Sequence, residues 1–363
     1  MKILFCITAM EKGGAERVVS TITNSMIEKN EISIVCLADK EIAYKLDERI
    51  KIKTLDEKEK RVNKLTKNYK RYVSMKNYIK EYNPDIIISF LPVPSFIAIL
   101  ANKRKVPIIV ADRNDPKEEY ASKIYNMLMK LLYKKANGFV FQTKEQKEYF
   151  SEVIQKKSTI ILNPVKEEFL KTTGEKEKEN VIVSVARLEE QKNYEMLINA
   201  FSKVNKKHDE YKLKILGDGI LREKLEQQIK SLNLEDDVLL YGICDNVKEE
   251  LEKSKIFVLS SNYEGMPNAL IEAMVLGMPV VSTDCPCGGP RELIQDNING
   301  ILVKVNDEKA LAEKIIYLIE NNEFADGLGK NAKLLGEKLN TKKIVAEWED
   351  YIKIIYKNNN KTK

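Results

Sequence analysis

The sequence predicts an α/β protein made of two domains, each with a parallel β-sheet covered by helices. Three observations support this class. The 363 residues fit two domains of ordinary size. Short, continuous apolar segments alternate with longer amphipathic ones, as expected of buried parallel strands connected by helices. A strongly charged stretch at residues 171–180 interrupts this alternation, and a second series begins after it.

The first series predicts an N-terminal domain over residues 1–170. A strand at 2–8 is followed by Gly13-Gly14 and then by a helix at 15–28, which carries Val18, Ile22 and Met26 along one face. Further strands are expected at 32–37, 85–90, 108–111, 138–142 and 160–164.

The second series predicts a C-terminal domain over residues 181–335, joined to the first by a linker at 171–180. Its expected strands are 181–185, 212–216, 238–241, 256–260, 279–282 and 300–303. Its expected helices are 194–206, 220–232, 247–253, 268–276 and 309–321. Within residues 336–363, a last helix over 341–356 carries the single tryptophan, and we expect this segment to pack back on the N-terminal domain. Such Rossmann-like domains bind ligands beyond the carboxyl ends of their strands.

The composition excludes several classes of protein. A hydrophobic fraction of 43% excludes a disordered chain. The five cysteines are odd in number and show no framework spacing, which indicates reduced thiols in the cytoplasm. With His208 as the single histidine, a Cys/His zinc site is nearly excluded, and a Ser-His-Asp or Cys-His catalytic group could form only around this residue.

The charge is concentrated in the first half of the chain. Residues 1–170 hold 32 Lys and Arg against 22 Asp and Glu, whereas the remainder holds 29 against 33. This asymmetry suggests an anionic partner, which could be nucleic acid, a phosphorylated ligand or a membrane surface. No signal peptide is expected, and the longest uncharged segment, 86–102, contains two prolines and is too short to span a bilayer.

Residues 58–80 predict a basic amphipathic helix. Nine Lys and Arg stand against one acid, Glu59. At 100° per residue, Val62, Leu65, Tyr69, Tyr72, Val73 and Lys76 fall on one side, and Lys60, Arg61, Lys64, Lys67 and Arg71 on the other. The apolar side could simply pack on the sheet, with solvated lysines opposite. The basic side could instead contact anionic lipid or the diphosphate of an acceptor. Given the charge asymmetry, we expect Lys60, Lys64, Lys67 and Arg71 to contact an anionic membrane surface.

Two carboxylates mark the sharpest motif. Glu264 lies in a loop after an expected strand, and Glu272 lies about one turn into the next helix. The Gly-Met-Pro turn between them exposes backbone amides near a helix N-terminus, which suits an anion. The carboxylates could accept hydrogen bonds from sugar hydroxyls, or they could be ordinary solvated groups.

Two other loops carry groups suited to phosphate. Arg187 and Lys192 lie between a strand and a helix, where a guanidinium and an ammonium suit a diphosphate, unless they form a surface pair. Gly13-Gly14 follows the first strand and permits close approach of the backbone to a ligand. The pair is not G-x-G-x-x-G, which argues against a nicotinamide site. Cys285 and Cys287 lie in a fourth, turn-rich loop and are interpreted as packing residues.

In this order and spacing, the motifs resemble those of the retaining nucleotide-sugar glycosyltransferases of family 4. The resemblance covers nearly the whole chain and also includes residues 217–219, 289–292 and 299–300. It implies the GT-B fold, with two Rossmann-like domains facing across a cleft. Within the family, the chain is most similar to bacterial enzymes that build lipid-linked oligosaccharides, O-antigen or capsule, such as N-acetylgalactosaminyl transferases.

The resemblance also implies roles for individual residues. Arg187, Lys192 and Glu264 would be catalytic. The donor, expected to carry uracil, although guanine stays open, would be bound by the residues Gly14, Arg187, Lys192, Gly242, Ile243, Glu264, Gly265, Met266, Pro267, Asn268, Ala269, Leu270 and Glu272. A lipid-linked acceptor would be bound at Asp112, Arg113 and Asn114, where many relatives have a histidine that is missing here. The enzyme would lie on the inner face of the cell membrane and would not bind nucleic acid.

The expected chemistry is transfer without a metal or other cofactor. No two aspartates are two residues apart, so the Asp-x-Asp pair that holds a metal in many transferases is absent, and Arg187 and Lys192 would stabilise the leaving diphosphate. A nucleotide-sugar epimerase or another GT-B enzyme is the alternative, although an epimerase needs proton-transfer groups and the chain has one histidine. A non-catalytic, two-lobed sugar-binding protein is a third hypothesis.

Overall fold

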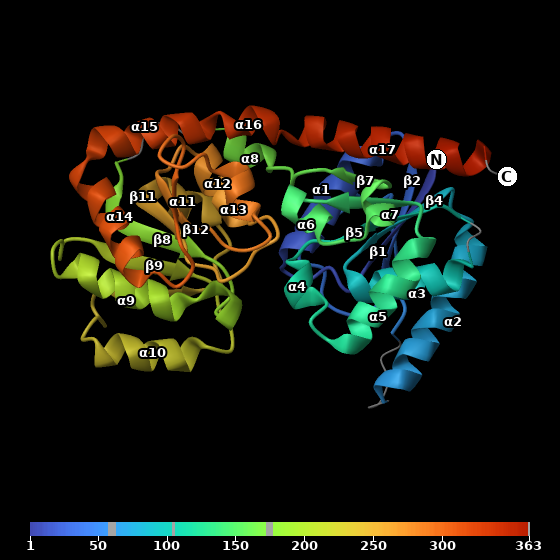
Figure 1. Ribbon diagram of the computed structural model, residues 1–363, viewed down its shortest axis with the longest axis horizontal. Coiled ribbons are helices and arrows are strands. Elements are labelled where there is room, and N and C mark those ends of the chain that lie inside the picture. Colours follow the sequence, from blue (N-terminus) through green and yellow to red (C-terminus); the bar gives the residue numbers. More distant parts are fainter. Residues whose placement is uncertain (57–62, 104–105, 172–176, 362–363) are drawn as a thin grey trace. The chain divides into compact units, whose positions relative to one another are not determined.

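The computed structural model describes residues 1–56, 63–103, 106–171 and 177–361. Contacts divide the chain into two compact units (Figure 1). Unit 1 comprises Met1–Pro164 together with Thr341–Lys363, and unit 2 comprises Val165–Asn340. Each unit contains one wholly parallel sheet with helices packed against it, so the predicted α/β class with two Rossmann-like domains is confirmed.

Unit 1 is built on a seven-stranded sheet in the order β3-β2-β1-β4-β5-β6-β7. Its strands are β1 (Lys2–Ile7), β2 (Glu31–Cys36), β3 (Lys51–Thr54), β4 (Ile86–Phe90), β5 (Ile108–Ala111), β6 (Gly138–Phe141) and β7 (Ser158–Ile160). Apart from Lys2 at the start of β1, the central strands are buried, as their apolar and β-branched sequences predict. The sequence did not predict β3, because Lys-Ile-Lys-Thr is a mostly exposed edge strand without an apolar run.

The helices of unit 1 form layers on the sheet. They are α1 (Gly14–Met26), α2 (Lys64–Tyr82), α3 (Pro92–Asn102), α4 (Pro116–Glu119), α5 (Lys123–Leu132), α6 (Lys144–Glu148), α7 (Glu152–Gln155) and α17 (Thr341–Lys361), with a 3-10 turn, η1, at Tyr133–Lys135. The helices α2, α3 and α5 pack side by side over one core cluster, and α1 packs with α17 (Figure 1).

The C-terminal helix α17 is built into unit 1 by aromatic packing. Trp348 is fully buried and stacks on Phe90 at the end of β4, with ring centroids 5.8 Å apart. Gly138 in β6 makes room for the same helix, because a Cβ there would lie 2.7 Å from the Tyr351 hydroxyl. That hydroxyl accepts a hydrogen bond from the Phe139 amide at 3.0 Å. The helix therefore completes the fold of unit 1.

Unit 2 repeats the plan with six parallel strands in the order β10-β9-β8-β11-β12-β13. The strands are β8 (Glu179–Val185), β9 (Lys212–Leu216), β10 (Val238–Gly242), β11 (Ser254–Leu259), β12 (Val280–Thr283) and β13 (Ile301–Val303). The helices are α8 (Glu167–Leu170), α9 (Tyr194–Asn205), α10 (Arg222–Ser231), α11 (Val247–Lys253), α12 (Asn268–Val275), α13 (Gly289–Leu293), α14 (Glu308–Glu320), α15 (Asn322–Lys333) and α16 (Leu335–Lys338), and a 3-10 turn, η2, spans Glu190–Lys192.

The boundaries of the two units along the sequence differ from the predicted domain boundaries. Residues 165–170 group with unit 2, because Val165 forms a β-bridge with Asn340 and α8 packs against α12. The predicted linker at 171–180 includes residues 172–176, which lie outside the described residues, and its last two residues begin β8. The segment that returns to unit 1 starts at Thr341, not at residue 336.

Candidate active site

Strand order singles out one place in unit 2 for a ligand. The neighbouring strands β8 and β11 lie at the centre of this sheet. After β8 the chain continues to β9 on one side of the sheet, and after β11 it continues to β12 on the other side. A ligand site is expected at such a point, outside the carboxyl ends of the strands. These two loops carry Arg187, Lys192 and Glu264, which the sequence analysis proposed as catalytic.

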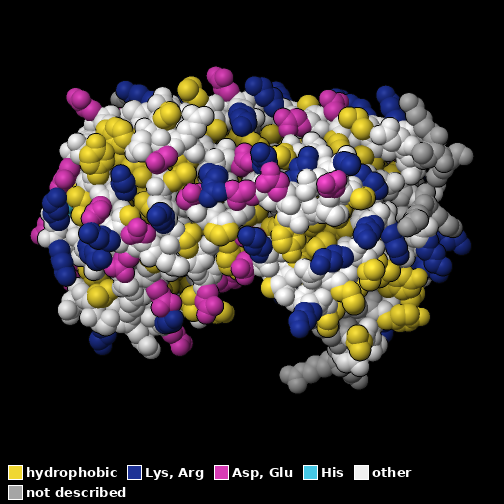
Figure 2. Space-filling view, in the orientation of Figure 1, with side chains coloured by type: hydrophobic (Ala, Val, Ile, Leu, Met, Phe, Trp, Pro, Cys, Tyr) yellow, Lys and Arg dark blue, Asp and Glu magenta, His cyan; other side chains and the backbone are white. Residues whose placement is uncertain are grey.

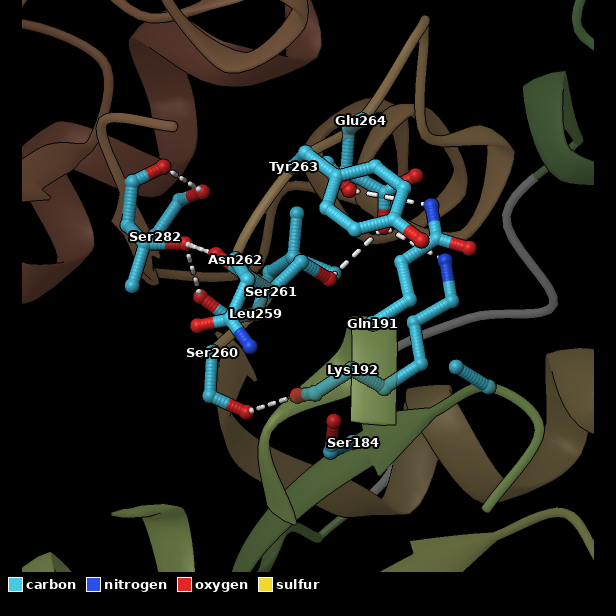
Figure 3. Close-up of polar contacts among 12 residues, drawn as sticks. Ser184, Gln191, Lys192, Leu259, Ser260, Ser261, Asn262, Tyr263, Glu264 and Ser282 are labelled. Atoms are coloured by element: carbon cyan, nitrogen blue, oxygen red, sulfur yellow. Dashed lines mark hydrogen bonds and ion pairs between the residues drawn. The ribbon is translucent and has the colours of Figure 1, made fainter. Parts of the chain in front are cut away.

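The structure brings Lys192 and Glu264 into direct contact (Figure 3). The Nζ of Lys192 lies 2.6 Å from the Oε1 of Glu264, and both side chains are largely buried. The hydroxyl of Ser261 donates to the same oxygen at 2.7 Å. Both bonds end on Oε1, and among the described residues no group donates a hydrogen bond to Oε2 of Glu264. The Oε2 atom can therefore accept a hydrogen bond from a ligand.

Short hydrogen bonds hold the two loops together (Figure 3). Ser260 donates to the carbonyl of Lys192 at 2.8 Å, and the Gln191 amide group donates to the carbonyl of Tyr263 at 2.9 Å. Thr283, at the end of β12, donates to the carbonyl of Ser261 at 2.6 Å. The ion pair is therefore held in place by its backbone before any ligand binds, which is the preorganisation that charge stabilisation requires.

Arg187 stands apart from this pair. Its side chain is 64% exposed and forms an ion pair with Glu189 at 2.8 Å. An exposed pair of this kind contributes little to stability, about 0–1 kcal/mol. The guanidinium can therefore exchange Glu189 for a phosphate at small cost. Two of the three proposed catalytic residues meet directly, and the third lies on the same loop as Lys192.

Most of the other proposed donor residues lie in the turn after Glu264 and in the first part of α12. Residues 265–270 lead into the helix, whose N-terminus has no side-chain cap, and Glu272 is buried in its second turn. Gly289, at the start of α13, lies against this turn, because a Cβ there would be 1.7 Å from the Gly265 carbonyl oxygen. The glycine in the turn-rich fourth loop is thus required by close packing.

Two other loops of unit 2 carry a predicted base contact and the two cysteines of the turn-rich loop. Gly242 ends β10 with a positive φ of 86°, and Ile243 after it is exposed. Cys285 and Cys287 are buried, and burial raises the pKa of the Cys285 thiol. This agrees with their interpretation as packing residues. In the part of the chain that the structure describes, no cluster of three His, Cys, Asp or Glu side chains could hold a metal ion.

The glycine loop of unit 1 is fixed by a residue that sequence reasoning missed. The Tyr44 hydroxyl accepts from the Gly13 amide at 3.1 Å and donates to the Gly13 carbonyl at 2.8 Å. Gly14 follows as the first residue of α1. Tyr44 belongs to a polar, irregular segment, and nothing in the sequence pattern linked it to the glycines.

Asp112, Arg113 and Asn114 follow β5 and line a small pocket together with residues of the loops after β4 and around α4. Asp112 is buried and accepts from the hydroxyls of Tyr120 at 2.9 Å and Tyr133 at 3.0 Å. Those hydroxyls also contact each other at 2.7 Å. Burial raises the pKa of Asp112 to about 7. If both phenols donate to an ionised Asp112, no proton is left for the contact between the two hydroxyls. A protonated Asp112 that donates to one tyrosine frees that hydroxyl to donate to the other, so that all three contacts are hydrogen bonds.

Arg113 is engaged inside unit 1. Its guanidinium lies 4.8 Å from the ring of Phe90 and 5.5 Å from that of Trp348, and it donates to Asn163 at 3.2 Å. Burial lowers its pKa to about 9. Among the described residues, none accepts a hydrogen bond from its Nε or Nη2. Asp112 and Arg113 thus contribute to the fold itself. Asn114, the third member of the proposed acceptor group, is partly exposed.

The proposed membrane residues have different surroundings in the structure. Lys60 lies outside the described residues. Arg71 is largely buried and donates from Nε and Nη2 to Asp56, at 2.8 and 2.7 Å, and Lys67 pairs with the same carboxylate at 3.0 Å. The core side of α2 consists of Met75, Ile79 and Tyr82 rather than its N-terminal apolar residues. None of the described helices is both long and apolar enough to cross a membrane.

Comparison with known proteins identifies the class. Residues 165–335 match the model of glycosyl transferases group 1, and residues 12–169 match that of glycosyltransferase family 4. The chain is 32% identical over 354 residues to the Campylobacter jejuni GalNAc-α-(1→4)-GalNAc-α-(1→3)-diNAcBac-PP-undecaprenol α-1,4-N-acetyl-D-galactosaminyltransferase, covering 96% of this chain and 97% of that protein. The chain therefore belongs to this glycosyltransferase family and is a glycosyltransferase.

Other relatives and solved structures agree with this placement. A second Campylobacter jejuni enzyme, N-acetylgalactosamine-N,N'-diacetylbacillosaminyl-diphospho-undecaprenol 4-α-N-acetylgalactosaminyltransferase, is 29% identical, with 97% of this chain and 99% of that protein covered. Anabaena HepE in complex with UDP-glucose has a TM-score of 0.85 at 19% identity, over 97% of this chain and 99% of that chain. Staphylococcus aureus TarM has a TM-score of 0.79 at 19% identity, over 96% and 98%. The fold is that of the GT-B glycosyltransferases.

The protonated state of Asp112 gives a test by pH. The folded protein retains this proton up to about pH 7, whereas the unfolded chain releases it near pH 4. The folded state then binds more protons in this interval, so the free energy of unfolding that Asp112 contributes falls as the pH rises from about 4 to about 7. Urea unfolding of wild type and Asp112→Asn should show this slope in the wild type and a flatter one in the variant. Asp350→Asn, at an exposed position of α17, is the control, and parallel wild-type and Asp112→Asn profiles would show that Asp112 is ionised when folded.

Proposed function

We propose that this glycosyltransferase moves a sugar, an N-acetylhexosamine or a hexose, from a UDP-sugar to a lipid-linked glycan, with retention of the anomeric configuration. One observation carries the proposal. At the point of unit 2 where the strand order reverses, Lys192 and Ser261 both bond to one oxygen of Glu264 and leave the other oxygen for a ligand. A cation and a carboxylate acceptor side by side suit a sugar attached to a diphosphate.

The donor contacts follow from this arrangement. Lys192 carries three N–H groups, of which one is used by Glu264, so the others can bind the β-phosphate. Glu264 Oε2 accepts from a hydroxyl of the transferred sugar, supported by the backbone from Gly265 to Leu270. Glu272 binds the ribose hydroxyls, and the backbone at Gly242 and Ile243 contacts the base. Gly14 is a further donor contact through its backbone amide.

Stabilisation of the leaving group is the main catalytic effect. Negative charge grows on the diphosphate as the glycosidic bond breaks, and preorganised cations lower the free energy of that transition state. Lys192 is buried and fixed, whereas Arg187 is exposed and can move onto the phosphate. These two cations perform the role that a metal has in other transferases, and no cofactor is required. We propose retention of the anomeric configuration because the chain belongs to this family. The acceptor would attack the anomeric carbon from the same face of the sugar from which the diphosphate departs.

The donor and acceptor classes are supported by the relatives. Both Campylobacter jejuni relatives are named as N-acetylgalactosaminyltransferases acting on undecaprenol diphosphate glycans. We propose the same substrate class here, with Asn114 contacting the acceptor and with Asp112 and Arg113 positioning that loop. The basic residues of α2, Lys64 and Lys67 with Lys60 before them, attract the anionic inner face of the cell membrane. Lys67 and Arg71 both pair with Asp56, but Arg71 is largely buried and supports the position of α2, whereas Lys67 is exposed.

The activity is tested by incubating the full chain with single UDP-sugars and either lipid-linked saccharides or soluble glycosides. We expect transfer to the lipid-linked acceptor, an axial product linkage from an axial donor by NMR, and the same rate in excess chelator. Epimerised donor without transfer would support the epimerase, and binding without turnover would support a sugar-binding protein. Loss of activity in chelator, restored by Mg²⁺ or Mn²⁺, would contradict the proposal of metal independence.

The two cations should differ in effect from other paired cations of unit 2. Lys192→Ala and Arg187→Ala are each expected to lower turnover by roughly 10²–10³, the scale of losing one preorganised donor to a developing negative charge. Lys214→Ala is the matched control for Lys192, because Lys214 forms a similarly buried pair with Glu250 at 2.8 Å. Lys224→Ala, which breaks an exposed pair with Glu195, is the control for Arg187. Near-normal turnover in both test variants would remove these roles.

The two glutamates should have separable effects. Glu272→Gln is expected to weaken the binding of free UDP, since it removes the acceptor of the ribose hydroxyls. Glu264→Gln should reduce turnover and leave UDP affinity intact, because its ligand is the transferred sugar, which UDP lacks. Calorimetry with UDP and initial-rate kinetics distinguish the two, with Glu250→Gln as a control for loss of a buried carboxylate. The reverse order of effects would exchange the roles.

A further inference from the structure

Unit 1 carries an apolar stripe on the outer side of α5 that its own fold does not cover. Ile124, Met127 and Leu131 are 65%, 53% and 58% exposed, although they are large and hydrophobic. Their spacing of three and four residues places them along one side of the helix. The opposite side, with Met129 and Leu132, is buried in the core of unit 1. The helix is therefore apolar on two sides, and only one of them has a partner within the unit.

Basic residues lie along one side of the stripe and beyond its C-terminal end. Lys123 and Lys130 lie on α5, Lys134 and Lys135 follow in η1, and all four are exposed. The sequence of α5 contains no acidic residue. On the neighbouring helix α3, Leu100 is exposed, and so is Lys103 directly after the helix. Helix α2, which packs against α3, has the exposed apolar residues Leu65 and Tyr69. Figure 2 shows hydrophobic and basic side chains together over this part of unit 1.

We propose that α5 inserts the stripe Ile124, Met127 and Leu131 into the headgroup and acyl boundary of an anionic lipid bilayer. An interfacial helix combines an apolar stripe with flanking lysines, and α5 shows both. The lysines bind lipid phosphates, while the apolar side chains leave water. A second copy of this chain fits less well, because the same lysines would face each other across the contact. The proposal rests on the proposed function only for the choice of a membrane as the partner.

Insertion by α5 differs from attraction by the basic residues of α2 in its response to salt. Attraction between charges is screened within about 3 Å at 1 M salt, whereas burial of apolar surface is not weakened by screening. An enzyme that is held by lysines alone would leave the vesicle at high salt. An enzyme that is held by the stripe would remain in part.

The first test is cosedimentation of the full chain with vesicles of phosphatidylcholine, with and without phosphatidylglycerol. The variant Ile124→Ser/Met127→Ser/Leu131→Ser keeps all charges and removes the stripe. We expect its partition to anionic vesicles to fall by about tenfold or more, with the largest relative loss at high salt. The matched control is Val153→Ser/Leu334→Ser/Ile354→Ser, whose side chains are 53%, 65% and 54% exposed elsewhere on the protein. It should bind as the wild type does.

The second test reports insertion directly. Trp348 is fully buried and out of reach of lipid, so an indole introduced by Met127→Trp gives a separate signal. Its emission should shift to the blue on anionic vesicles and be quenched by brominated lipid, whereas that of Val153→Trp should not. Circular dichroism checks that each variant is folded.

The outcomes separate this inference from the proposed function. Equal binding of wild type and the α5 variant, with an unquenched indole, would overturn insertion by α5. Absence of vesicle binding by the wild type, or a dimer that the α5 variant loses in ultracentrifugation, would overturn it as well. Failure of sugar transfer in an enzyme that still binds vesicles through α5 would contradict the proposed function and leave this inference standing. Turnover of the α5 variant on a soluble glycoside should equal that of the wild type.

Discussion

The constraint on which the site depends is the direction of the strands. Every strand of both sheets is parallel to its neighbours, so all loops that follow strands emerge at one edge of each sheet. In unit 2 the chain builds outward from β8 in one direction and then returns to build outward from β11 in the other. The two loops at this reversal follow neighbouring strands, and Lys192 and Glu264 make a direct contact between them.

The chemistry of the pair is set by what surrounds it. A buried cation and a buried carboxylate lose hydration, and their attraction compensates for that loss only with good geometry and further hydrogen bonds. The short contact at 2.6 Å and the Ser261 hydroxyl meet both conditions. The bonds from Ser260, Gln191 and Thr283 fix the loops that carry the pair. The charges of the pair are therefore already oriented for the donor phosphate and sugar that we propose as their ligands.

Unit 1 is organised around polar groups that serve its interior. Asp112 shares hydrogen bonds with two tyrosines, and Arg113 lies against Phe90 and Trp348. Through Trp348, the guanidinium contacts α17, a helix from the far end of the sequence. The loop after β5, a place where the sequence suggested direct contact with substrate, is thus also where the C-terminal segment is held.

Local patterns in the sequence determined most of the fold. Runs such as Ile86 to Phe90 are apolar at every position, because both faces of a central parallel strand are buried. The spacing of charged residues after such runs placed Lys192 and Glu264 on loops that follow strands, and the structure brings these two side chains together. The edge strand β3 was not predicted, because it is mostly exposed and therefore has no run of apolar residues.

Only the tertiary structure decided which residues meet and which remain exposed. Ser261 and Tyr44 have no distinguishing sequence pattern, and their roles depend on contacts with residues that are close in space alone. Arg71 is indistinguishable in sequence from the lysines around it, but Asp56 lies within its reach. The apolar residues of α5 match the pattern of a buried helix, and the sheet can cover only one side of it. Periodicity records which residues share a face of a helix, whereas the packing of distant elements determines whether that face is covered.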